Sequence, residues 1–172
     1  NVVVGRHAPG TGEVEIRVHA AGLHFRDVLS VIGMYKGKPG PLGGECAGAI
    51  VRVGPGVKSL RPGDEVIALG SGCFAKFLTT SADLVWPKPA NLSFEAAVTI
   101  PIAFLTAWYA LKSIAEIQPE ERVLIHAGAG GVGLAAIQIA QNAGAIVFAT
   151  AGSPEKRAYL QSIGVRHVMD SR

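Results

Sequence analysis

The 172-residue chain contains little cysteine and few aromatic or charged residues. Its only cysteines, Cys46 and Cys73, are too few for a disulfide framework or a four-cysteine zinc site, which favours a reducing, cytoplasmic setting. Aromatic residues make up 6% of the chain, and the basic residues behind its net charge of +3 are scattered, so nucleic acid is a poor candidate partner. The composition, 49% hydrophobic and 17% charged, is that of a globular protein.

Charge is missing altogether between Val123 and Pro154, where no Asp, Glu, Lys or Arg occurs. An uncharged stretch of this length could be taken for a membrane-spanning segment. However, it holds six glycines plus His126, Gln138, Gln141 and Asn142. Buried strands and a helix joined by a glycine turn explain the segment better, and we expect no membrane partner.

This stretch contains the glycine pattern of a dinucleotide-binding turn. An apolar run, Val123–Ile125, leads into a GxGxxG spacing and then into a long apolar helix whose polar residues fall on one stripe. Such glycines allow a tight turn, close approach of a pyrophosphate to the backbone, and close packing of helix on strand. The pyrophosphate is expected at the positive end of the helix. The predicted cofactor-binding residues of the turn are Gly128, Ala129, Gly130, Gly131, Val132 and Gly133.

The end of the next strand favours NADPH over NADH. An NAD site usually places an Asp or Glu about 20 residues after the glycines, where it binds the ribose hydroxyls. Here the strand ends at Thr150 without an acid, and Ser153, Lys156 and Arg157 supply a hydroxyl and two cations for an adenosine 2′-phosphate. The alternative is that Ser153 only caps the next helix and the cations are solvated. Both can hold, because a cap and a phosphate site use the same helix start.

The first hundred residues have the pattern of a small β domain. Alternating apolar residues predict strands at 13–20, 48–53, 64–68 and 74–78, separated by glycine and proline turns. Two helices are expected next, one capped by Ser93 and one over Pro101–Leu111. We place a domain boundary near residue 117, which gives domains 1–117 and 118–172.

The second domain is expected to hold only part of a nucleotide fold. A third strand is predicted at 165–169, whereas a doubly wound domain has about six strands. The chain begins at Asn1, without an initiator methionine and without a signal-peptide pattern. We therefore expect a fragment of a longer protein.

A β barrel followed by a Rossmann unit resembles the medium-chain dehydrogenase/reductase superfamily, whose first domain is GroES-like. Several blocks are similar to the enoyl reductase domains of modular polyketide synthases. These blocks are Gly22–Leu29, Gly33–Tyr35, Leu42–Gly48, Pro101–Leu111 and His126–Gly133. NADPH quinone oxidoreductases share the last of them and the Leu-Thr-Ala sequence, and are the close alternative. The fold class implied is α/β: a GroES-like β barrel domain followed by an incomplete Rossmann dinucleotide-binding domain.

The resemblance also implies that no metal is bound. Zinc alcohol dehydrogenases of this superfamily carry a Cys where His24 stands and a His where Gly44 stands, and they add a four-cysteine lobe. A catalytic zinc needs three protein ligands, which this pattern does not provide. Without a metal to polarise an alcohol, the implied chemistry is reduction of a conjugated double bond.

The activity implied is that of an NADPH-dependent enoyl-acyl carrier protein reductase. Hydride passes to the β carbon of an α,β-unsaturated acyl thioester, and the resulting enolate needs hydrogen-bond donors near its oxygen. The implied partners are an acyl carrier protein with a phosphopantetheine-linked acyl chain and the other domains of a synthase. The enolate can be protonated, or can close to a cyclopropane if the γ carbon bears a leaving group. A quinone reductase and a non-catalytic structural use of the fold stay open as other functions.

The resemblance assigns roles to individual residues. Tyr35 occupies the place of a tyrosine near the substrate's α carbon, and is the implied catalytic residue; without the resemblance, a surface turn aromatic is favoured. His24, where the family usually has Asn, is expected near the nicotinamide or substrate, and Thr106 is a candidate hydrogen bond to the nicotinamide amide. The simpler alternatives are a core histidine and an ordinary helix threonine. Arg172, with Lys156, completes the clamp on the 2′-phosphate, and the family's catalytic Lys and Asp are expected beyond it.

Overall fold

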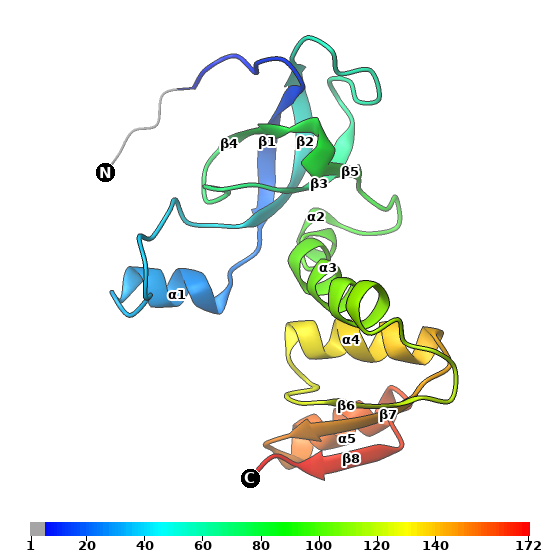
Figure 1. The fold of residues 1–172 in the computed structure, drawn as a ribbon. Helices are drawn as coiled ribbons and strands as arrows, with labels where there is room; N and C mark the ends of the chain where they lie inside the picture. Colours follow the sequence, from blue (N-terminus) through cyan, green and yellow to red (C-terminus); the bar gives the residue numbers. More distant parts are fainter. Residues whose placement is uncertain (1–5) are drawn as a thin grey trace. The chain divides into compact units, whose positions relative to one another are not determined.

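The computed structural model describes residues 6–172. These residues form two compact units that divide between Pro101 and Ile102 (Figure 1). An antiparallel sheet organises the first unit and a parallel sheet organises the second. The chain therefore has a GroES-like β domain followed by part of a Rossmann-like domain, as predicted. The boundary predicted near residue 117 placed the helices after Ile102 with the first domain, whereas the structure groups them with the second unit.

Five strands form the sheet of the first unit, in the order β4–β1–β2–β3–β5, and all neighbouring pairs are antiparallel. Their bounds are Glu13–Ala21 for β1, Glu45–Val53 for β2, Glu65–Leu69 for β3, Phe77–Ser81 for β4 and Val85–Pro87 for β5. The register of β1 on β2 shifts at two points, after Glu15 and after Val18. Such bulges add local twist and bend the strand.

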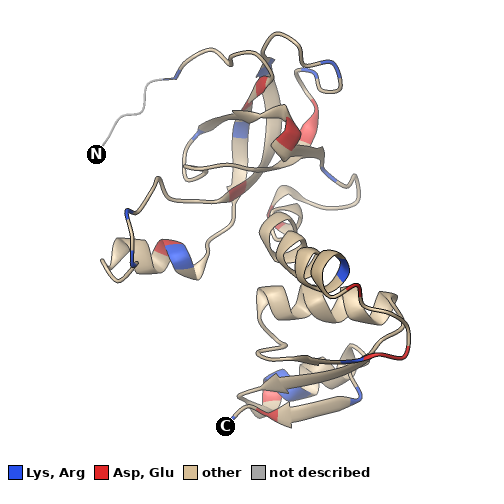
Figure 2. Ribbon diagram, viewed as in Figure 1, with Lys and Arg blue, Asp and Glu red and all other residues tan. Residues whose placement is uncertain are grey.

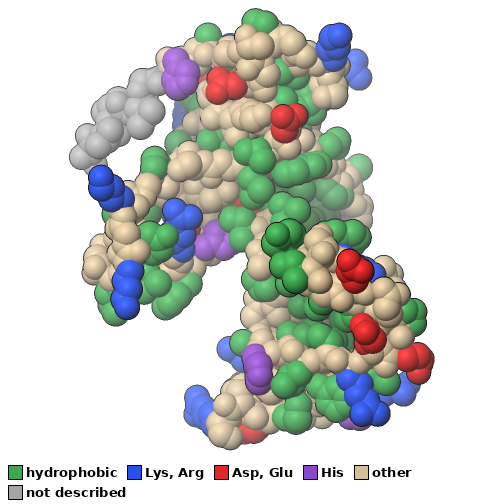
Figure 3. Space-filling model, viewed as in Figure 1, with side chains coloured by type: hydrophobic (Ala, Val, Ile, Leu, Met, Phe, Trp, Pro, Cys, Tyr) green, Lys and Arg blue, Asp and Glu red, His purple; other side chains and the backbone are tan. Residues whose placement is uncertain are grey.

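Three short helices accompany this sheet: α1 (Phe25–Val31), the 3₁₀ helix η1 (Ala82–Leu84) and α2 (Phe94–Ala97). The predicted cap of α2 is confirmed, because the Ser93 hydroxyl accepts a hydrogen bond from the N–H of Ala96 at 3.2 Å. Helix α1 was not predicted. Apolar side chains reach its surface (Figure 3), and Leu23, Phe25 and Val31 are each more than two-thirds exposed, so no apolar stripe marks it as a helix.

Strand β2 is buried on both faces where it begins. Cys46 packs in one apolar cluster with Val14 and Ile16, whereas Ala47 packs in another cluster with Ala97 of α2. Because successive strand residues point to opposite faces, the strand start lacks the alternation of a half-buried strand. The sequence therefore predicted this strand only from Gly48.

Strand β4 also differs from its prediction, lying at 77–81 instead of 74–78. The backbone N–H groups of Cys73 and Phe74 donate to the carbonyls of Gly43 and Leu42, at 3.2 and 3.3 Å. This segment thus pairs with the loop before β2 and joins the sheet only afterwards.

The second unit contains a three-stranded parallel sheet in the order β6–β7–β8. Its elements are α3 (Pro101–Trp108), the π-helix η2 (Tyr109–Ile114), β6 (Arg122–Ile125), α4 (Gly131–Asn142), β7 (Ile146–Ala151), α5 (Pro154–Ser162) and β8 (His167–Asp170). Helices α4 and α5 are the crossovers that parallel strands require. The strand, turn, helix and strand predicted from the uncharged stretch are confirmed.

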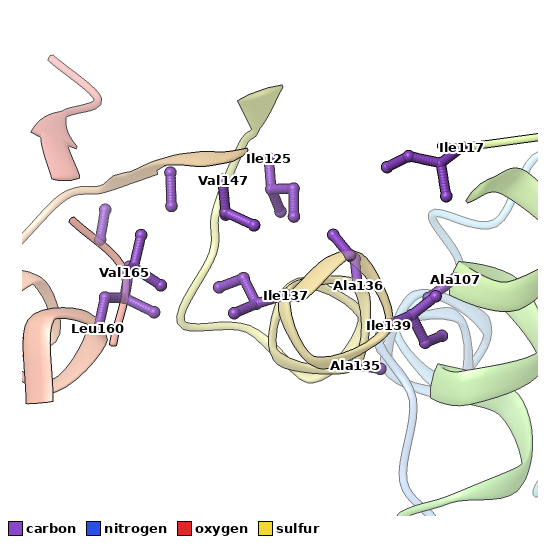
Figure 4. Close-up of a cluster of buried hydrophobic side chains, with 13 residues drawn as sticks. Ala107, Ile117, Ile125, Ala135, Ala136, Ile137, Ile139, Val147, Leu160 and Val165 are labelled. Carbon is purple, nitrogen blue, oxygen red and sulfur yellow. The ribbon is translucent and has the colours of Figure 1, made fainter. Parts of the chain in front are cut away.

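The core of the second unit forms around α4 (Figure 4). Ile137 of α4 packs in the same cluster as Ile125, Val147 and Leu160, which come from both flanking strands and from α5. The polar stripe predicted for α4 is exposed, at Gln138, Gln141 and Asn142. This burial holds α4 against the sheet. The position of the glycine turn before α4 is fixed as a result.

The segment Phe94–Ile114 is long and apolar enough to cross a membrane by length and composition alone. In this structure 28% of its most apolar window is buried, and part of the segment packs on protein. Phe94 and Ala97 join a cluster of the first unit, and Phe104 and Ala107 join the core of the second. The segment thus contributes residues to the cores of both units, while Trp108, Tyr109 and Ile114 stay exposed.

Candidate dinucleotide-binding site

The glycine turn between β6 and α4 is tied to the end of the neighbouring strand. The N–H of Gly128 donates to the carbonyl of Thr150, the penultimate residue of β7, at 2.8 Å. Ala127 takes a left-handed backbone conformation with φ of 50°, and its carbonyl accepts from the N–H of Gly130 at 2.9 Å. The turn therefore has a fixed shape at the carboxyl edge of the sheet, where nucleotides bind in open α/β sheets.

The glycines of the turn differ in what a side chain at each position would contact. A Cβ on Gly133 would lie 2.5 Å from the carbonyl oxygen of Ala127 and 2.7 Å from that of Gly128. A Cβ on Gly128 would lie 3.0 Å from the Cβ of Ala149. Around Gly131, in contrast, nothing lies within 4 Å of a Cβ. Gly133 thus permits the turn and Gly128 the strand packing, while Gly131 leaves open backbone that a phosphate can approach.

The first turn of α4 offers donors and positive potential to an anion. In a helix, each N–H donates to the carbonyl four residues earlier. For Gly131, Val132 and Gly133 that carbonyl would lie before the helix begins, so their N–H groups have no intrahelical acceptor. Gly130 is the N-cap and supplies no side-chain acceptor. Helix α4 carries no charged residue (Figure 2), so no carboxylate neutralises the positive end of its dipole. These residues fit a pyrophosphate.

A pocket of about 370 Å³ lies beside the turn. The turn lines it through Ala129 and Gly130, and the end of β7 lines it through Thr150. Lys156 and Ser171 contribute from α5 and from the residues after β8. Of the predicted site residues, Ala129, Gly130, Thr150 and Lys156 line this pocket, whereas Gly128, Gly131, Val132 and Gly133 do not.

Five of the residues that line the pocket were not predicted as site residues: His126, Ala127, Ala151, Gly152 and Ser171. His126 lies at the start of the turn, and its Nδ1 is 3.2 Å from the hydroxyl of Thr150. Ser171 lines the same pocket from the end of β8. The position of His126 directly before the glycines was a usable signal. Nothing in the local sequence around Ser171 marks it, because its place depends on the pairing of β8 with β7.

Of the residues after β7, Ser153 caps the next helix and Lys156 lines the pocket. The hydroxyl of Ser153 accepts from the N–H of Lys156 at 3.4 Å and so caps α5, with Pro154 at the first helical position, as the alternative interpretation expected. Hydrogen bonds from its own N–H and from Ser153 lower the pKa of Glu155. The Lys156 side chain is exposed and lines the pocket.

The prediction of two free cations requires a correction at Arg157. Its guanidinium donates to the carbonyl of Ala151 at 3.0 Å and forms an ion pair with Asp170 at 2.9 Å. These contacts join the ends of β7 and β8. Lys156 is therefore the cation of this pair that is available to a ligand.

Arg172 lies near the same strand end. Its backbone N–H donates to the carboxylate of Asp170 at 3.1 Å, and its Nε lies 3.9 Å from the position of a Cβ on Gly152. Its side chain is exposed. Gly152 and Lys156 line the pocket, whereas Arg172 approaches Gly152 without lining it.

In the first unit, the carboxylate of Asp27 joins two loops. It accepts from the backbone N–H of His24 and from that of Gly43, both at 3.0 Å. Burial opposes its ionisation, but these two N–H donors, with the nearby His24, lower the pKa of Asp27. The start of α1 is thus fastened to the loop before β2.

His24 itself lies against a buried carboxylate. Its Nε2 is 2.6 Å from Oε1 of Glu45, and the two side chains are 29% and 3% exposed. A Cβ on Gly22 would lie within 3 Å of three Glu45 atoms, so the glycine is required for the carboxylate to sit there. No local pattern in the sequence connects His24 with Glu45, and their contact was not predicted.

The other two predicted residues occupy separate units. Tyr35 follows α1 in the first unit, where its N–H donates to the carbonyl of Leu29 at 3.1 Å. The guanidinium of Arg26 lies 5.3 Å from the centre of its ring, within the range of a cation–π contact. Thr106 is exposed on α3, in the second unit. Tyr35, predicted to act on the substrate, therefore lies in the first unit. Thr106, predicted to bind the nicotinamide, lies in the second unit with the nucleotide turn.

No metal cluster was found in the part of the chain that the structure describes: residues 6–172 contain no group of three or more His, Cys, Asp and Glu able to hold an ion. Cys46 and Cys73 are buried thiols in the apolar core of the first unit.

Comparison with known proteins supports the two-part architecture. Residues 10–90 match the alcohol dehydrogenase GroES-like domain, and residues 131–172 match the zinc-binding dehydrogenase family. A phenolphthiocerol/phthiocerol polyketide synthase protein of Mycobacterium tuberculosis is 46% identical over 172 residues, which are 98% of this chain and 8% of that protein.

Two solved structures show the same fold. The CurK enoyl reductase has a TM-score of 0.93 and 50% identity, over 98% of this chain and 54% of that one. The Escherichia coli quinone oxidoreductase, solved with NADPH, has a TM-score of 0.87 and 34% identity, over 98% of this chain and 53% of that one. The chain spans about half the length of these structures, and its turn fits a nicotinamide dinucleotide, of which the NADPH in the quinone oxidoreductase structure is an example. This chain belongs to the medium-chain dehydrogenase/reductase superfamily, in the group formed by the enoyl reductase domains of polyketide synthases.

Proposed function

We propose that this chain is part of an NADPH-dependent, zinc-independent enoyl reductase in a polyketide synthase, acting on an α,β-unsaturated acyl thioester. The observation that carries the cofactor assignment is the glycine turn with an acid-free β7 beside it. The activity rests on the similarity to polyketide synthase enoyl reductases, which is higher than the similarity to the quinone oxidoreductase.

The cofactor would be held by the second unit. The N–H groups at the start of α4 bind the pyrophosphate, because they are unpaired within the helix and face open space at Gly131. Lys156 and Arg172 bind the 2′-phosphate, since both are exposed cations near the end of β7. When bound, NADPH supplies a hydride. The absence of an acid at the end of β7 removes the carboxylate that would repel a 2′-phosphate.

The first unit would serve the acyl thioester. Reduction at the β carbon leaves negative charge on the thioester oxygen, and the α carbon then needs a proton. Tyr35 is the proposed proton donor through its phenol hydroxyl, with its ring beside Arg26. The thioester is proposed to arrive on the phosphopantetheine arm of an acyl carrier protein, with other synthase domains as neighbours.

The test uses the complete reductase domain that contains this chain. Oxidation of NADPH is followed by absorbance with a crotonyl thioester, with a quinone, and with neither. We expect turnover with the thioester, and a preference for NADPH over NADH. Turnover of quinones without turnover of thioesters would select the quinone reductase instead. Tight NADPH binding without reduction of either substrate would select a non-catalytic role.

The identity of the product separates two outcomes of the same reduction. A thioester with a leaving group on the γ carbon is offered beside one without it, and both products are weighed by mass spectrometry. Protonation keeps the leaving group, whereas internal displacement by the enolate releases it and closes a cyclopropane. A proton donor at Tyr35 predicts the protonated product.

A further inference from the structure

Asp170 places a carboxylate beside the dinucleotide pocket. It ends β8 and lies opposite Ala151 in the parallel pairing of β8 with β7. Ala151 lines the pocket, and so does Ser171, the residue directly after Asp170. Neighbouring strands lie about 4.8 Å apart, so the backbone of Asp170 stands one strand spacing from the pocket wall. A net charge on Asp170 is therefore felt in the pocket, because charges act over about 8 Å at physiological ionic strength.

A negative charge at this position discriminates between the two nicotinamide dinucleotides. NADPH differs from NADH by a 2′-phosphate, and a phosphate monoester carries about −1.5 to −2 charges at neutral pH. A free carboxylate repels that group, whereas at the end of a strand it can accept hydrogen bonds from the ribose hydroxyls of NADH. An unpaired Asp170 would therefore favour NADH over NADPH.

Arg157 of α5 neutralises this carboxylate. Its Nη1 lies 2.9 Å from Oδ2 of Asp170 in an ion pair, and it also donates to the carbonyl of Ala151 at 3.0 Å. The contact with Ala151 fixes the guanidinium at the end of β7. The second carboxylate oxygen, Oδ1, accepts from the backbone N–H of Arg172 at 3.1 Å. Both oxygens of Asp170 thus have a partner, and its charge is balanced by a guanidinium that stays protonated.

Arg157 is placed to act through Asp170 and not by touching the cofactor. The residues that line the pocket include Lys156 but not Arg157, the next residue of α5. Successive residues of a helix point about 100° apart, so Lys156 faces the pocket while Arg157 faces the end of β8. The start of α5 therefore directs one cation to the pocket and the other to Asp170.

We propose that Arg157 is a specificity-determining residue for NADPH, because it neutralises Asp170 and so keeps this carboxylate from repelling the 2′-phosphate beside Lys156. This inference rests on the proposed function, in which the second unit binds NADPH. Arg157 is a positioning residue, since it sets the charge and the place of Asp170 without contacting the cofactor. The preference for NADPH then depends on the pairing at the ends of β7 and β8 as well as on the acid-free end of β7.

The test is a double-mutant cycle in the complete reductase domain. Arg157→Gln removes the cation, keeps a side-chain donor and leaves Asp170 charged. Asp170→Asn removes the carboxylate and keeps an acceptor for the N–H of Arg172. Arg166→Gln is the matched control, because Arg166 is an exposed cation at the opposite end of β8. The Kd values for NADPH and NADH are measured by fluorescence titration at low ionic strength, without an acyl substrate.

The two cofactors should respond differently. Arg157→Gln should raise the Kd for NADPH about three- to tenfold and leave that for NADH within about twofold, the size expected of one charge acting on a phosphate in largely aqueous surroundings. Asp170→Asn alone should lower the Kd for NADPH about two- to fivefold, because Arg157 then adds an unbalanced positive charge. The double variant should bind NADPH within about twofold of the wild type, and Arg166→Gln should match the wild type. Salt at about 0.5 M should reduce the effect of Arg157→Gln, since it shortens the reach of charge.

The outcomes separate this inference from the proposed function. If the wild-type domain binds NADPH no more tightly than NADH, the NADPH assignment of the proposed function fails. If the wild type prefers NADPH but Arg157→Gln weakens both cofactors equally, Arg157 has a merely structural role. If Asp170→Asn does not restore NADPH binding to Arg157→Gln, the neutralisation of Asp170 is wrong. If Arg157→Gln does not fold, Asp170→Asn decides, because unchanged or weaker NADPH binding in this variant would overturn the inference.

Discussion

Replacing Gly133 by alanine should disrupt the nucleotide turn more than any other single methyl group added there. The new Cβ would lie 2.5 Å from the carbonyl oxygen of Ala127 and 2.7 Å from that of Gly128, closer than Cβ atoms are found to other atoms. The contacting atoms are backbone, so the turn itself must move. Overpacking of this kind costs about 1–3 kcal/mol, more than the roughly 1 kcal/mol that alanine gains over glycine within a helix.

The displacement should weaken NADPH binding more than it weakens folding. The N–H groups that would hold the pyrophosphate belong to the same turn, and a hydrogen bond to a charged group contributes about 1.5–3 kcal/mol. Since 1.4 kcal/mol is a factor of ten, the Kd for NADPH should rise at least about tenfold. Fluorescence titration of the complete domain with NADPH measures this, and thermal unfolding without cofactor measures the stability change.

Gly131→Ala is the matched comparison for the stability measurement. The space around its Cβ is open to 4 Å, so the variant should fold at least as stably as the wild type. Its new methyl group would still stand where the phosphate approaches, so NADPH should bind more weakly with no loss of folding stability. Equal melting temperatures and equal NADPH affinities for Gly133→Ala and the wild type would show that the turn accommodates a Cβ at this position.

Three further predictions concern other residues. Lys156→Ala should raise the Kd for NADPH about three- to tenfold and leave that for NADH unchanged, because an exposed cation on a phosphate contributes about 1 kcal/mol; equal losses for both cofactors would contradict the assignment. Tyr35→Phe should bind NADPH normally but lose control of the α-carbon configuration with an α-methyl substrate, as read by chiral chromatography of the product. Hydrogen bonds from Arg6 and then Arg52 lower the pKa of Glu15 to about 2. Its contribution to stability is therefore complete above its ordinary pKa and is lost as pH falls toward 2, a loss that denaturant titrations should show in the wild type and not in Glu15→Gln.

The parts of the site that were predictable are those encoded by neighbouring residues. The glycine spacing at 128–133 fixes a turn because a Cβ at Gly133 meets the turn's own backbone. Ser153 followed by Pro154 specifies a helix start through local hydrogen bonding and the fixed proline φ. Such features depend on a few bonds along the chain, so a single sequence is enough to detect them.

The features that were missed depend on pairing between distant segments. Arg157 was expected to be free, but Asp170 reaches it only because β8 pairs with β7. Glu45 meets His24 because β1 pairs with β2 so that Ala21 lies opposite Cys46. Strand β4 starts later than predicted, since the residues before it bond to the loop at Leu42 and Gly43. Neither the secondary-structure propensity of a residue nor the local hydrophobic periodicity of the sequence shows which distant segments will pair.

We propose that this fold delivers hydride from NADPH to the β carbon of an enoyl thioester. The most direct test supplies the complete domain with NADPH carrying deuterium at the transferred position and with a crotonyl thioester on a carrier protein. Mass spectrometry and NMR of the released acyl group should place one deuterium on the β carbon. A product with deuterium elsewhere, or an unchanged substrate after NADPH has been shown to bind, would contradict the account.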